Sequence, residues 1–471
     1  MRPKKRKRGE FVWSQALSGS RIMHLTSVPG NVFRFVRSGV TKFSRLWRVG
    51  ERPFARHLLL VMSGTALAQL TTFLFTPILS RMYGPSDFGS FGAYGAVLAV
   101  LGTGATLNYT DALMLPQDGQ DAAPLLLAAG LSTTFIALGT GLGCALITRP
   151  CLALLGLTSL GRGIWFLPLS VLVLGLSLCL NSWCIRQKAF RASSAGQLLR
   201  AGVACGAQAT AGTARLGGIG LIGAALVAEV SVLVFLGRAA LARDAKVFLV
   251  AVDWRVLGRS AWRYRAFALY GAPMGVMNAL SQGLPVILFT HYYGAAVAGF
   301  YVLAVRLLQT PMNFVLVSVR QVLFQKLAEI AARGHDLSEA FQKATGSLAA
   351  VVILPSACIF LAAPRVVALV FGESWRETGE YARWLVFWLA PMFCNVPATL
   401  TARILRLQRD LFIFDALLLS ARLAALWYGG LNLPPLETII LFSMVGSLLN
   451  ILLIVHVGFR ARSHASQFST P

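Results

Sequence analysis

Charged side chains are scarce in this chain of 471 residues. They make up 13% of it, against roughly 25% in an average soluble domain, whereas 56% of the residues are apolar and the mean hydropathy is +0.66. This composition excludes a soluble globular enzyme, a disordered protein and a collagen-like fibre. The apolar runs are about 20 residues long rather than the ~10-residue alternating segments of an outer-membrane barrel, so a polytopic helical membrane protein remains.

Sequence patterns for catalysis and metal binding are also missing. The seven cysteines include no CxxC pair and no Cys/His spacing typical of zinc. The chain contains no Walker A motif, no GxSxG and no HExxH. No segment outside the apolar runs is large enough for a glycosyltransferase domain. We therefore predict a protein that is not an enzyme and that holds no metal and no cofactor.

Acidic residues are fewer than basic ones, with 18 Asp and Glu against 43 Lys and Arg and a net charge of +25. The basic residues follow the membrane topology. With a cytoplasmic N-terminus, the inner connections and the C-terminal tail carry 19 Lys and Arg, counting Arg238 and Lys343 at the ends of the adjoining segments, whereas the outer connections carry 6. This asymmetry predicts cytoplasmic termini. It is counted over twelve expected segments, at about 57–80, 88–107, 121–147, 164–185, 193–213, 217–240, 267–290, 297–319, 340–362, 379–402, 410–430 and 435–458.

The segments and the charge distribution together predict five regions along the chain. We expect two six-helix lobes, a cytoplasmic linker between them and a cytoplasmic tail at each end; the regions are 1–56, 57–240, 241–266, 267–458 and 459–471. The first tail carries 14 Lys and Arg. Its apolar residues Phe33, Val36, Val40, Phe43 and Trp47 recur every three or four positions, which indicates an interfacial amphipathic helix. We expect this tail to bind anionic lipid headgroups rather than nucleic acid.

The two sets of six segments repeat weakly. Tyr83-Gly84 after the first segment recurs as Tyr293-Gly294 after the seventh, and Gly89 recurs as Gly299 at the same offset of 210. Arg200 in the fifth segment has a counterpart in Arg422 of the eleventh, at an offset of 222. Because six is an even number, both halves enter the membrane in the same direction. The repeat therefore predicts two parallel lobes related by an axis along the membrane normal.

Polar residues within the apolar segments share helical faces. Such groups are costly in hydrocarbon, so they usually face the bundle interior or water. Interhelical hydrogen bonds are the structural alternative to a substrate cavity. The faces consist of Thr65, Gln69, Thr72 and Thr76 in the first segment, Asn278, Ser281 and Gln282 in the seventh, and Arg306, Gln309, Thr310 and Asn313 in the eighth.

Charged residues within the segments allow two interpretations. Arg200 and Glu229 lie in neighbouring segments and can form a structural ion pair, or Glu229 can relay protons. Arg422 has no partner in the sequence unless Asp415 reaches it. Arginines that line a polar cavity indicate an anionic substrate or headgroup, because a guanidinium binds phosphate through two hydrogen bonds.

Several junction motifs resemble the polysaccharide flippases (Wzx type) of the MOP superfamily. They are the stretch from Pro77 to Phe91, Leu284-Pro285 with Tyr293-Gly294 and Gly299-Phe300-Tyr301, Arg306 five residues before Pro311, and Phe371-Gly372-Glu373-Ser374-Trp375. The resemblance covers about residues 57–460. It implies an all-α fold of twelve transmembrane helices in two lobes, located in the bacterial inner membrane. Arg306 matches an arginine that lies in the cavity of the related lipid II flippases, whereas the arginines that those relatives carry within their first two segments are absent here.

The resemblance also implies the function. The family moves a polyprenyl-pyrophosphate-linked oligosaccharide outward by alternating access, without ATP, and polysaccharide assembly proteins are possible partners. In this interpretation, the cavity is lined by the first, seventh and eighth segments, with help from Arg422 or Arg200. Two alternatives remain open. A drug or cation exporter of the same superfamily would be expected to carry a carboxylate in the first segment, and a polysaccharide polymerase or ligase would need a large outer loop.

Overall fold

The computed structural model describes residues 52–116, 119–146, 158–250, 254–333 and 336–468. Side chains before Gly64 are outside this description, as are the basic tail up to residue 51 and its predicted amphipathic helix. Residues 59–471 form one compact unit, to which the following applies. All regular structure in the described ranges is helical.

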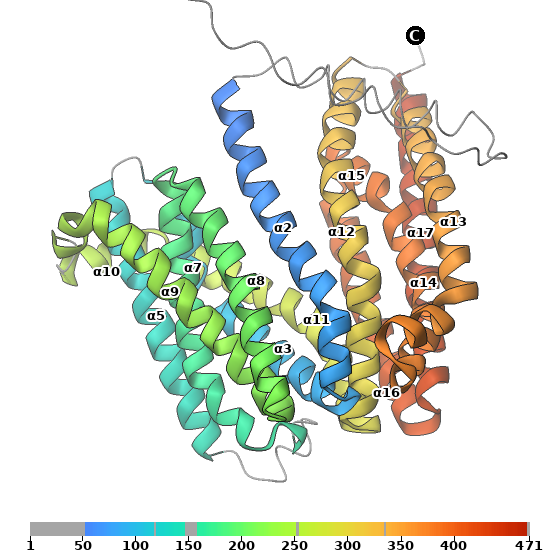
Figure 1. Cartoon of the computed structure of the whole chain (residues 1–471). Coiled ribbons are helices and arrows are strands. Elements are labelled where there is room, and N and C mark those ends of the chain that lie inside the picture. Colours follow the sequence, from blue (N-terminus) through green and yellow to red (C-terminus); the bar gives the residue numbers. More distant parts are fainter. Residues whose placement is uncertain (1–51, 117–118, 147–157, 251–253, 334–335, 469–471) are drawn as a thin grey trace, which may run out of the picture. The chain divides into compact units, whose positions relative to one another are not determined.

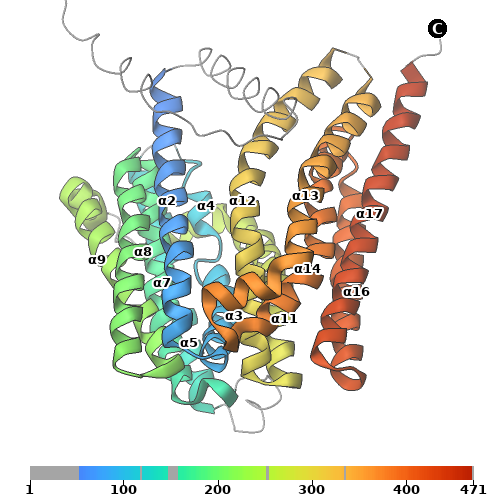
Figure 2. The same ribbon diagram turned by 45° about the vertical axis from the view of Figure 1, so that its right-hand side comes forward.

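The N-terminal half comprises the helices from α2 to α9. In both views, α5, α7, α8 and α9 lie together on one side, and α2 passes between α8 and the C-terminal helix α12 (Figures 1 and 2). The elements are α2 (Arg52–Met82), α3 (Pro85–Ala105), α4 (Tyr109–Ala112), α5 (Gly119–Leu146), η1 (Thr158–Phe166), α7 (Leu167–Arg186), α8 (Phe190–Thr213) and α9 (Gly217–Val250).

The C-terminal half comprises the helices from α11 to α17. A short helix, α10 (Trp254–Arg263), and a π-helical turn, η2 (Phe267–Gly271), connect it to the N-terminal half, so much of the expected linker is helical. The elements are α11 (Ala272–Tyr293), α12 (Ala295–Ala332), α13 (Leu337–Phe371), η3 (Glu373–Trp375), α14 (Arg376–Cys394), α15 (Val396–Ile404), α16 (Gln408–Asn432) and α17 (Pro435–Phe468).

Ten segments within the described ranges are long and apolar enough to cross a membrane. They are Pro85–Ala105, Ala122–Leu146, Gly163–Arg186, Gly217–Ala242, Phe267–Tyr293, Ala295–Leu316, Leu337–Phe371, Glu373–Ile404, Gln408–Asn432 and Pro435–Ser463. The expected count of twelve is therefore not reproduced by this criterion. The helices α2 and α8 coincide with the first and fifth expected segments but are not among the ten. In α8 the reason is visible in its sequence, because polar residues such as Gln197, Arg200 and Gln208 lower its hydropathy.

Asp87 fixes the beginning of α3. One of its carboxylate oxygens accepts a hydrogen bond from the Gly84 amide at 3.0 Å, which satisfies a donor at the helix N-terminus. Its other oxygen accepts from the Gly218 amide at 2.7 Å, at the beginning of α9. Pro85 at the first turn lacks an N–H that would otherwise need a partner. The carboxylate thereby joins the beginnings of two helices of the same half.

The two halves repeat their contacts as well as their sequence. The Tyr83 hydroxyl donates to the Gln208 carbonyl at 2.6 Å, joining the end of α2 to α8. The Tyr293 hydroxyl contacts the Gly429 carbonyl at 2.8 Å, joining the end of α11 to α16. Gln208 and Gly429 are 221 positions apart, close to the offset between Arg200 and Arg422. Equivalent tyrosines therefore bind equivalent carbonyls, as an internal repeat requires.

The repeated glycines, Gly89 and Gly299, meet each other where α3 crosses α12. A Cβ atom at Gly89 would overlap the carbonyl oxygen of Ala295, and one at Gly299 would overlap the carbonyl oxygen of Pro85. Only glycine lets the two backbones approach this closely. The N-terminal half therefore touches the C-terminal half through two equivalent positions of the repeat.

Trp375 makes a second connection between the halves. Its indole Nε1 donates to the Ser80 carbonyl at 2.8 Å, and the side chain is completely buried. The ring packs edge-on against Phe88 of α3, with centroids 5.0 Å apart. An indole needs a hydrogen-bond acceptor when it is buried, so this contact is specific as well as apolar.

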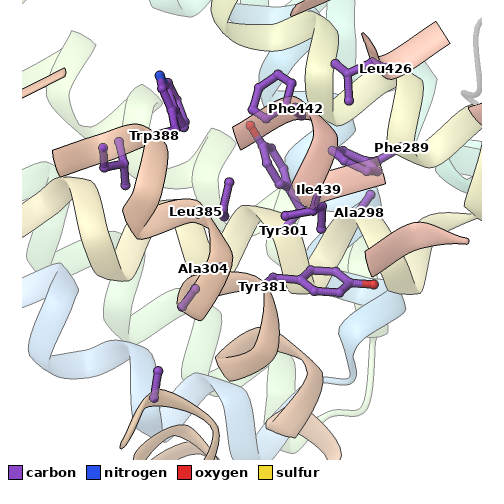
Figure 3. Close-up of a cluster of buried hydrophobic side chains, with 13 residues drawn as sticks. Phe289, Ala298, Tyr301, Ala304, Tyr381, Leu385, Trp388, Leu426, Ile439 and Phe442 are labelled. Carbon is purple, nitrogen blue, oxygen red and sulfur yellow. The ribbon is translucent and has the colours of Figure 1, made fainter. Parts of the chain in front are cut away.

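The core of the C-terminal half is aromatic. Figure 3 shows Phe289, Tyr301, Trp388 and Phe442 converging from α11, α12, α14 and α17. The Phe289 and Tyr301 ring centroids are 4.8 Å apart, and those of Trp388 and Phe442 are 5.5 Å apart. These contacts hold α12, and hence Arg306 five residues beyond Tyr301, in a fixed position.

The glycine crossing generates a prediction about stability. We expect Gly89→Ala to lower the free energy of unfolding by about 1–3 kcal/mol, because the new methyl group forces α3 and α12 apart. Gly95→Ala in the same helix is the matched control, since a Cβ atom there has no neighbour within 4 Å. Thermal unfolding of the purified variants measures the difference. Equal melting temperatures for the two variants would contradict the tight crossing.

Candidate functional site

A cavity of about 400 Å³ lies within the N-terminal half. It is lined by α2, α3, α7, α8 and α9, and by one residue of the other half, Arg306 of α12. Small residues of α8, Ala201 and Ala204, face this space and leave room in it. The polar groups of the lining are Thr65, Gln69, Thr72, Tyr94, Ser170, Gln197, Arg200, Gln208, Glu229 and Arg306.

Arg306 reaches the cavity from the C-terminal half. One terminal nitrogen of its guanidinium donates to the Thr72 carbonyl of α2 at 3.3 Å. That carbonyl also accepts from the Thr76 hydroxyl at 2.8 Å, while the Thr72 hydroxyl donates to the Ala68 carbonyl. No carboxylate within the described residues forms an ion pair with Arg306. Its positive charge is therefore available to an anion in the cavity.

Arg200 and Glu229 form the ion pair that their neighbouring segments allowed. A terminal nitrogen of Arg200 is 2.8 Å from a carboxylate oxygen of Glu229, and the other donates to Gln197 at 3.1 Å. Their side chains are 33% and 13% exposed, respectively. The Nε of Arg200 is buried and has no partner among the described residues. The structure therefore contains the ion pair that the sequence allowed. The proton relay at Glu229 stays a prediction.

Four further polar residues of the lining were not selected from the sequence. The Tyr94 hydroxyl donates to the Ser170 hydroxyl at 2.5 Å, which joins α3 to α7 at the cavity. Gln197 and Gln208 lie on the same face of α8 as Arg200, at spacings of three and eight residues. That spacing in the sequence could have predicted that the two glutamines share the face of Arg200. Nothing in the sequence indicates the pairing of Tyr94 with Ser170.

The cavity contains only part of the predicted site. Gln69, Thr72, Arg200, Glu229 and Arg306 line it. The remaining predicted residues, Gln309, Thr310, Asn313, Asn278, Gln282 and Arg422, do not line this cavity. Asn278 and Gln282 are exposed on α11 and hydrogen-bond to each other at 3.3 Å. The cavity thus differs from the one expected between the first, seventh and eighth segments, since α11 contributes nothing to it.

Arg422 occupies the position in the C-terminal half that corresponds to Arg200, but its surroundings differ. Its guanidinium carbon lies 4.0 Å from the centroid of Trp388 and 4.2 Å from that of Phe442. The ring faces therefore stabilise its charge by cation–π interaction in place of a carboxylate. Asp415, considered from the sequence, forms no ion pair with it in the described structure. Of the two equivalent arginines, only Arg200 faces the cavity.

The charges of the cavity determine which ligands it favours. Two arginines and one glutamate line it, which leaves an excess of one positive charge. Guanidinium groups bind phosphate through paired hydrogen bonds, and amides and hydroxyls bind sugar hydroxyls. The described residues contain no cluster of three or more His, Cys, Asp or Glu that could hold a metal ion. The arrangement suits an anionic group attached to a polar one.

A protein-family model described as Polysaccharide biosynthesis protein matches residues 78–380. The match covers more than half of the chain and includes α3, α7, α8, α9 and α12, which line the cavity together with α2. The chain belongs to this family. The predictions of a multi-pass helical membrane protein and of a polysaccharide-related family are therefore confirmed.

A named relative supports the same assignment. The chain is 28% identical, over 313 residues, to the succinoglycan biosynthesis transport protein ExoT of Rhizobium meliloti. The aligned region covers 64% of this chain and 59% of the relative, so the chain spans less than two thirds of the relative's length.

Solved structures show the fold. An inward-facing MATE family transporter of the MOP superfamily matches with a TM-score of 0.65, at 13% identity, over 85% of this chain and 96% of that chain. The lipid II flippase MurJ in an inward closed conformation also has a TM-score of 0.65, at 12% identity, over 86% of this chain and 90% of that chain. The predicted MOP-type fold is therefore confirmed.

The ion pair generates a prediction about coupling. We expect Arg200→Gln and Glu229→Gln each to lower the free energy of unfolding by roughly 1–2 kcal/mol, because each leaves a half-buried charge without its partner. The double variant should lose less than the sum of the two. A double-mutant cycle by thermal unfolding measures the coupling. Additive losses would show that the 2.8 Å contact contributes nothing to folding.

Proposed function

We propose that this protein moves a polyprenyl-pyrophosphate-linked oligosaccharide from the cytoplasmic to the periplasmic leaflet of the bacterial inner membrane. The two halves alternate access to the cavity without ATP. The observation that carries the proposal is the pair of arginines, Arg306 and Arg200, in a polar cavity of a protein that belongs to a polysaccharide biosynthesis family. The relative from Rhizobium meliloti, described as a transport protein for succinoglycan biosynthesis, supports transport rather than polymerisation.

The diphosphate binds between Arg306 and Arg200. Arg306 comes from the C-terminal half and Arg200 from the N-terminal half, so one anion contacts both halves at once. Gln69, Gln197 and Gln208 contact the first sugars through their amides. The exposed amides of Asn278 and Gln282 and the α12 residues Gln309, Thr310 and Asn313 receive further sugars when the halves change their relative position. The prenyl chain stays in the lipid.

Glu229 competes with the substrate for Arg200. The carboxylate occupies one terminal nitrogen of Arg200 at 2.8 Å while Nε has no partner among the described residues. A diphosphate that binds this guanidinium displaces the carboxylate. The release of Glu229 from Arg200 is the step at which this carboxylate acts as the proposed proton relay.

The competing function is a drug or cation exporter of the same fold. That alternative was expected to carry a carboxylate in the first segment, and α2 contains no Asp or Glu between Arg52 and Met82. The excess positive charge of the cavity also disfavours cations. The distribution of Lys and Arg supports cytoplasmic termini in this proposal. There the basic tail meets anionic headgroups, and polysaccharide assembly proteins can reach it.

The proposal predicts that Arg306→Ala lowers the rate of flipping by roughly 10- to 100-fold, the value of a charge-assisted hydrogen bond to phosphate. The rate is measured in proteoliposomes that contain a fluorescent lipid-pyrophosphate-linked oligosaccharide. An added quencher removes the fluorescence of the substrate molecules in the outer leaflet. Arg333→Ala, an exposed arginine at the end of the same helix, is the matched control and should flip normally.

Melting temperatures of the variants separate a folding defect from a binding defect. If Arg306→Ala folds and flips at the wild-type rate, the arginine is structural and the anion site is wrong. A folded wild-type protein that flips no substrate of a broad panel would overturn the transport assignment itself.

The competition at Arg200 predicts that removal of the Glu229 charge raises the affinity for a diphosphate. Glu229→Gln should raise the affinity for farnesyl pyrophosphate by roughly fivefold, because an amide no longer neutralises Arg200. Glu377→Gln, which changes an exposed glutamate in α14, should leave the affinity unchanged. Titration calorimetry of the protein in nanodiscs measures both. An unchanged or weakened affinity in Glu229→Gln would show that the carboxylate does not compete with the anion.

A further inference from the structure

The short helix α10, in the connection between the halves, carries a row of cations on one face. Arg255, Arg259 and Arg263 recur every four residues, and all three are exposed. Residues at this spacing lie on the same side of a helix. The Nε of Arg259 donates to the Arg255 carbonyl at 3.3 Å, which keeps that side chain along the helix surface. From Trp254 to Gly271 the sequence contains four arginines and no acidic residue.

The opposite face of α10 is fixed to the N-terminal half. Ala261 and Tyr264 pack against a buried cluster that includes Tyr109, Leu125 and Trp183. The Tyr109 hydroxyl also donates to the Ala261 carbonyl at 3.3 Å. Because this face is held by packing and by a hydrogen bond, the arginine row has a fixed outward direction.

An exposed tryptophan lies directly beside the arginine row. Trp262 follows Arg255 by seven residues, about two helical turns, and is 70% exposed. The guanidinium carbon of Arg265 lies 4.0 Å from the centroid of its ring. Tyr270, which follows in η2, is 76% exposed. Tryptophan and tyrosine beside arginines are typical of the boundary between lipid headgroups and acyl chains.

We propose that the exposed face of α10 and the residues directly after it, formed by Arg255, Arg259, Trp262, Arg263 and Arg265, binds the headgroups of anionic bilayer phospholipids. The arginines contact the lipid phosphates, and the Trp262 ring enters the region of the glycerol backbone. Charge complementarity favours a phosphate-bearing partner, since the surface has no acidic residue in the described part of the connection. The exposed aromatic residues favour a lipid over a free anion. A lipid has acyl chains that contact an aromatic ring, whereas a small hydrated anion has no apolar part.

This surface is separate from the cavity and does not depend on the proposed transport. The surface lies in the connection between the two halves, so a lipid bound there acts on that connection. The chain passes from α10 through the π-helical turn η2 into α11, the first helix of the C-terminal half. A bound headgroup therefore holds the connection between the halves at the surface of the bilayer.

The test measures lipid binding to the full chain. Native mass spectrometry of the purified protein, titrated with phosphatidylglycerol or phosphatidylcholine, reports the affinity for each lipid. We expect the wild type to prefer phosphatidylglycerol, and the triple variant R255Q/R259Q/R263Q to lose at least about tenfold of that affinity. The control R215Q/R365Q/R376Q removes three exposed arginines outside this surface and should keep it.

Two further measurements separate the possible results. Inorganic phosphate at the same concentration should not displace the lipid, and displacement would assign the surface to a free anion instead. In vesicles with brominated phosphatidylglycerol, quenching of tryptophan fluorescence should be smaller in Trp262→Phe than in the wild type. Equal affinities of the wild type and the triple variant for phosphatidylglycerol, or equal quenching in Trp262→Phe, would overturn the proposal.

Discussion

An arginine inside a membrane-spanning bundle needs a partner for its charge, and this constraint organises both halves of the molecule. Three such arginines are stabilised in three different ways. Arg200 pairs with Glu229, Arg422 lies against the rings of Trp388 and Phe442, and Arg306 has one hydrogen bond, to a backbone carbonyl, within the described structure. The charge of Arg306 is thus the least compensated of the three. Arg306 lines a polar cavity, which is the physical basis of the binding site that we propose at this position.

The internal repeat explains why the site is asymmetric. Equivalent tyrosines bind equivalent carbonyls in the two halves, and equivalent glycines meet at the crossing of α3 and α12. The halves differ in the surroundings of their equivalent arginines, Arg200 and Arg422. The arginine of α8 faces the cavity, whereas its counterpart in α16 is enclosed by the aromatic core. In the proposed mechanism the N-terminal half supplies most of the binding site, and the C-terminal half contributes Arg306.

Segment positions could be predicted from the sequence because apolar runs of about 20 residues have few alternative structures in a membrane. The ion pair of Arg200 with Glu229 could be expected because the two helices are neighbours. The enclosure of Arg422 could not, since Trp388 and Phe442 lie on helices whose contacts depend on tertiary packing. The cavity enclosed by α2, α3, α7, α8 and α9 was not predicted either. Polar faces on α11 and α12 indicated a cavity there, but periodicity shows which residues share a face and not what that face meets.

The accessibility of Ala204, which lines the cavity, tests the central claim that a hydrated, positively charged site lies within the bundle. Ala204→Cys, introduced into a chain without other cysteines, can be treated with charged thiosulfonate reagents of either sign. The account predicts that the anionic reagent reacts faster than the cationic one and that farnesyl pyrophosphate slows the reaction. Val227→Cys, at an exposed apolar position of α9, should not react, because lipid excludes both reagents. An Ala204→Cys protein as unreactive as Val227→Cys, or one that prefers the cationic reagent, would contradict the account.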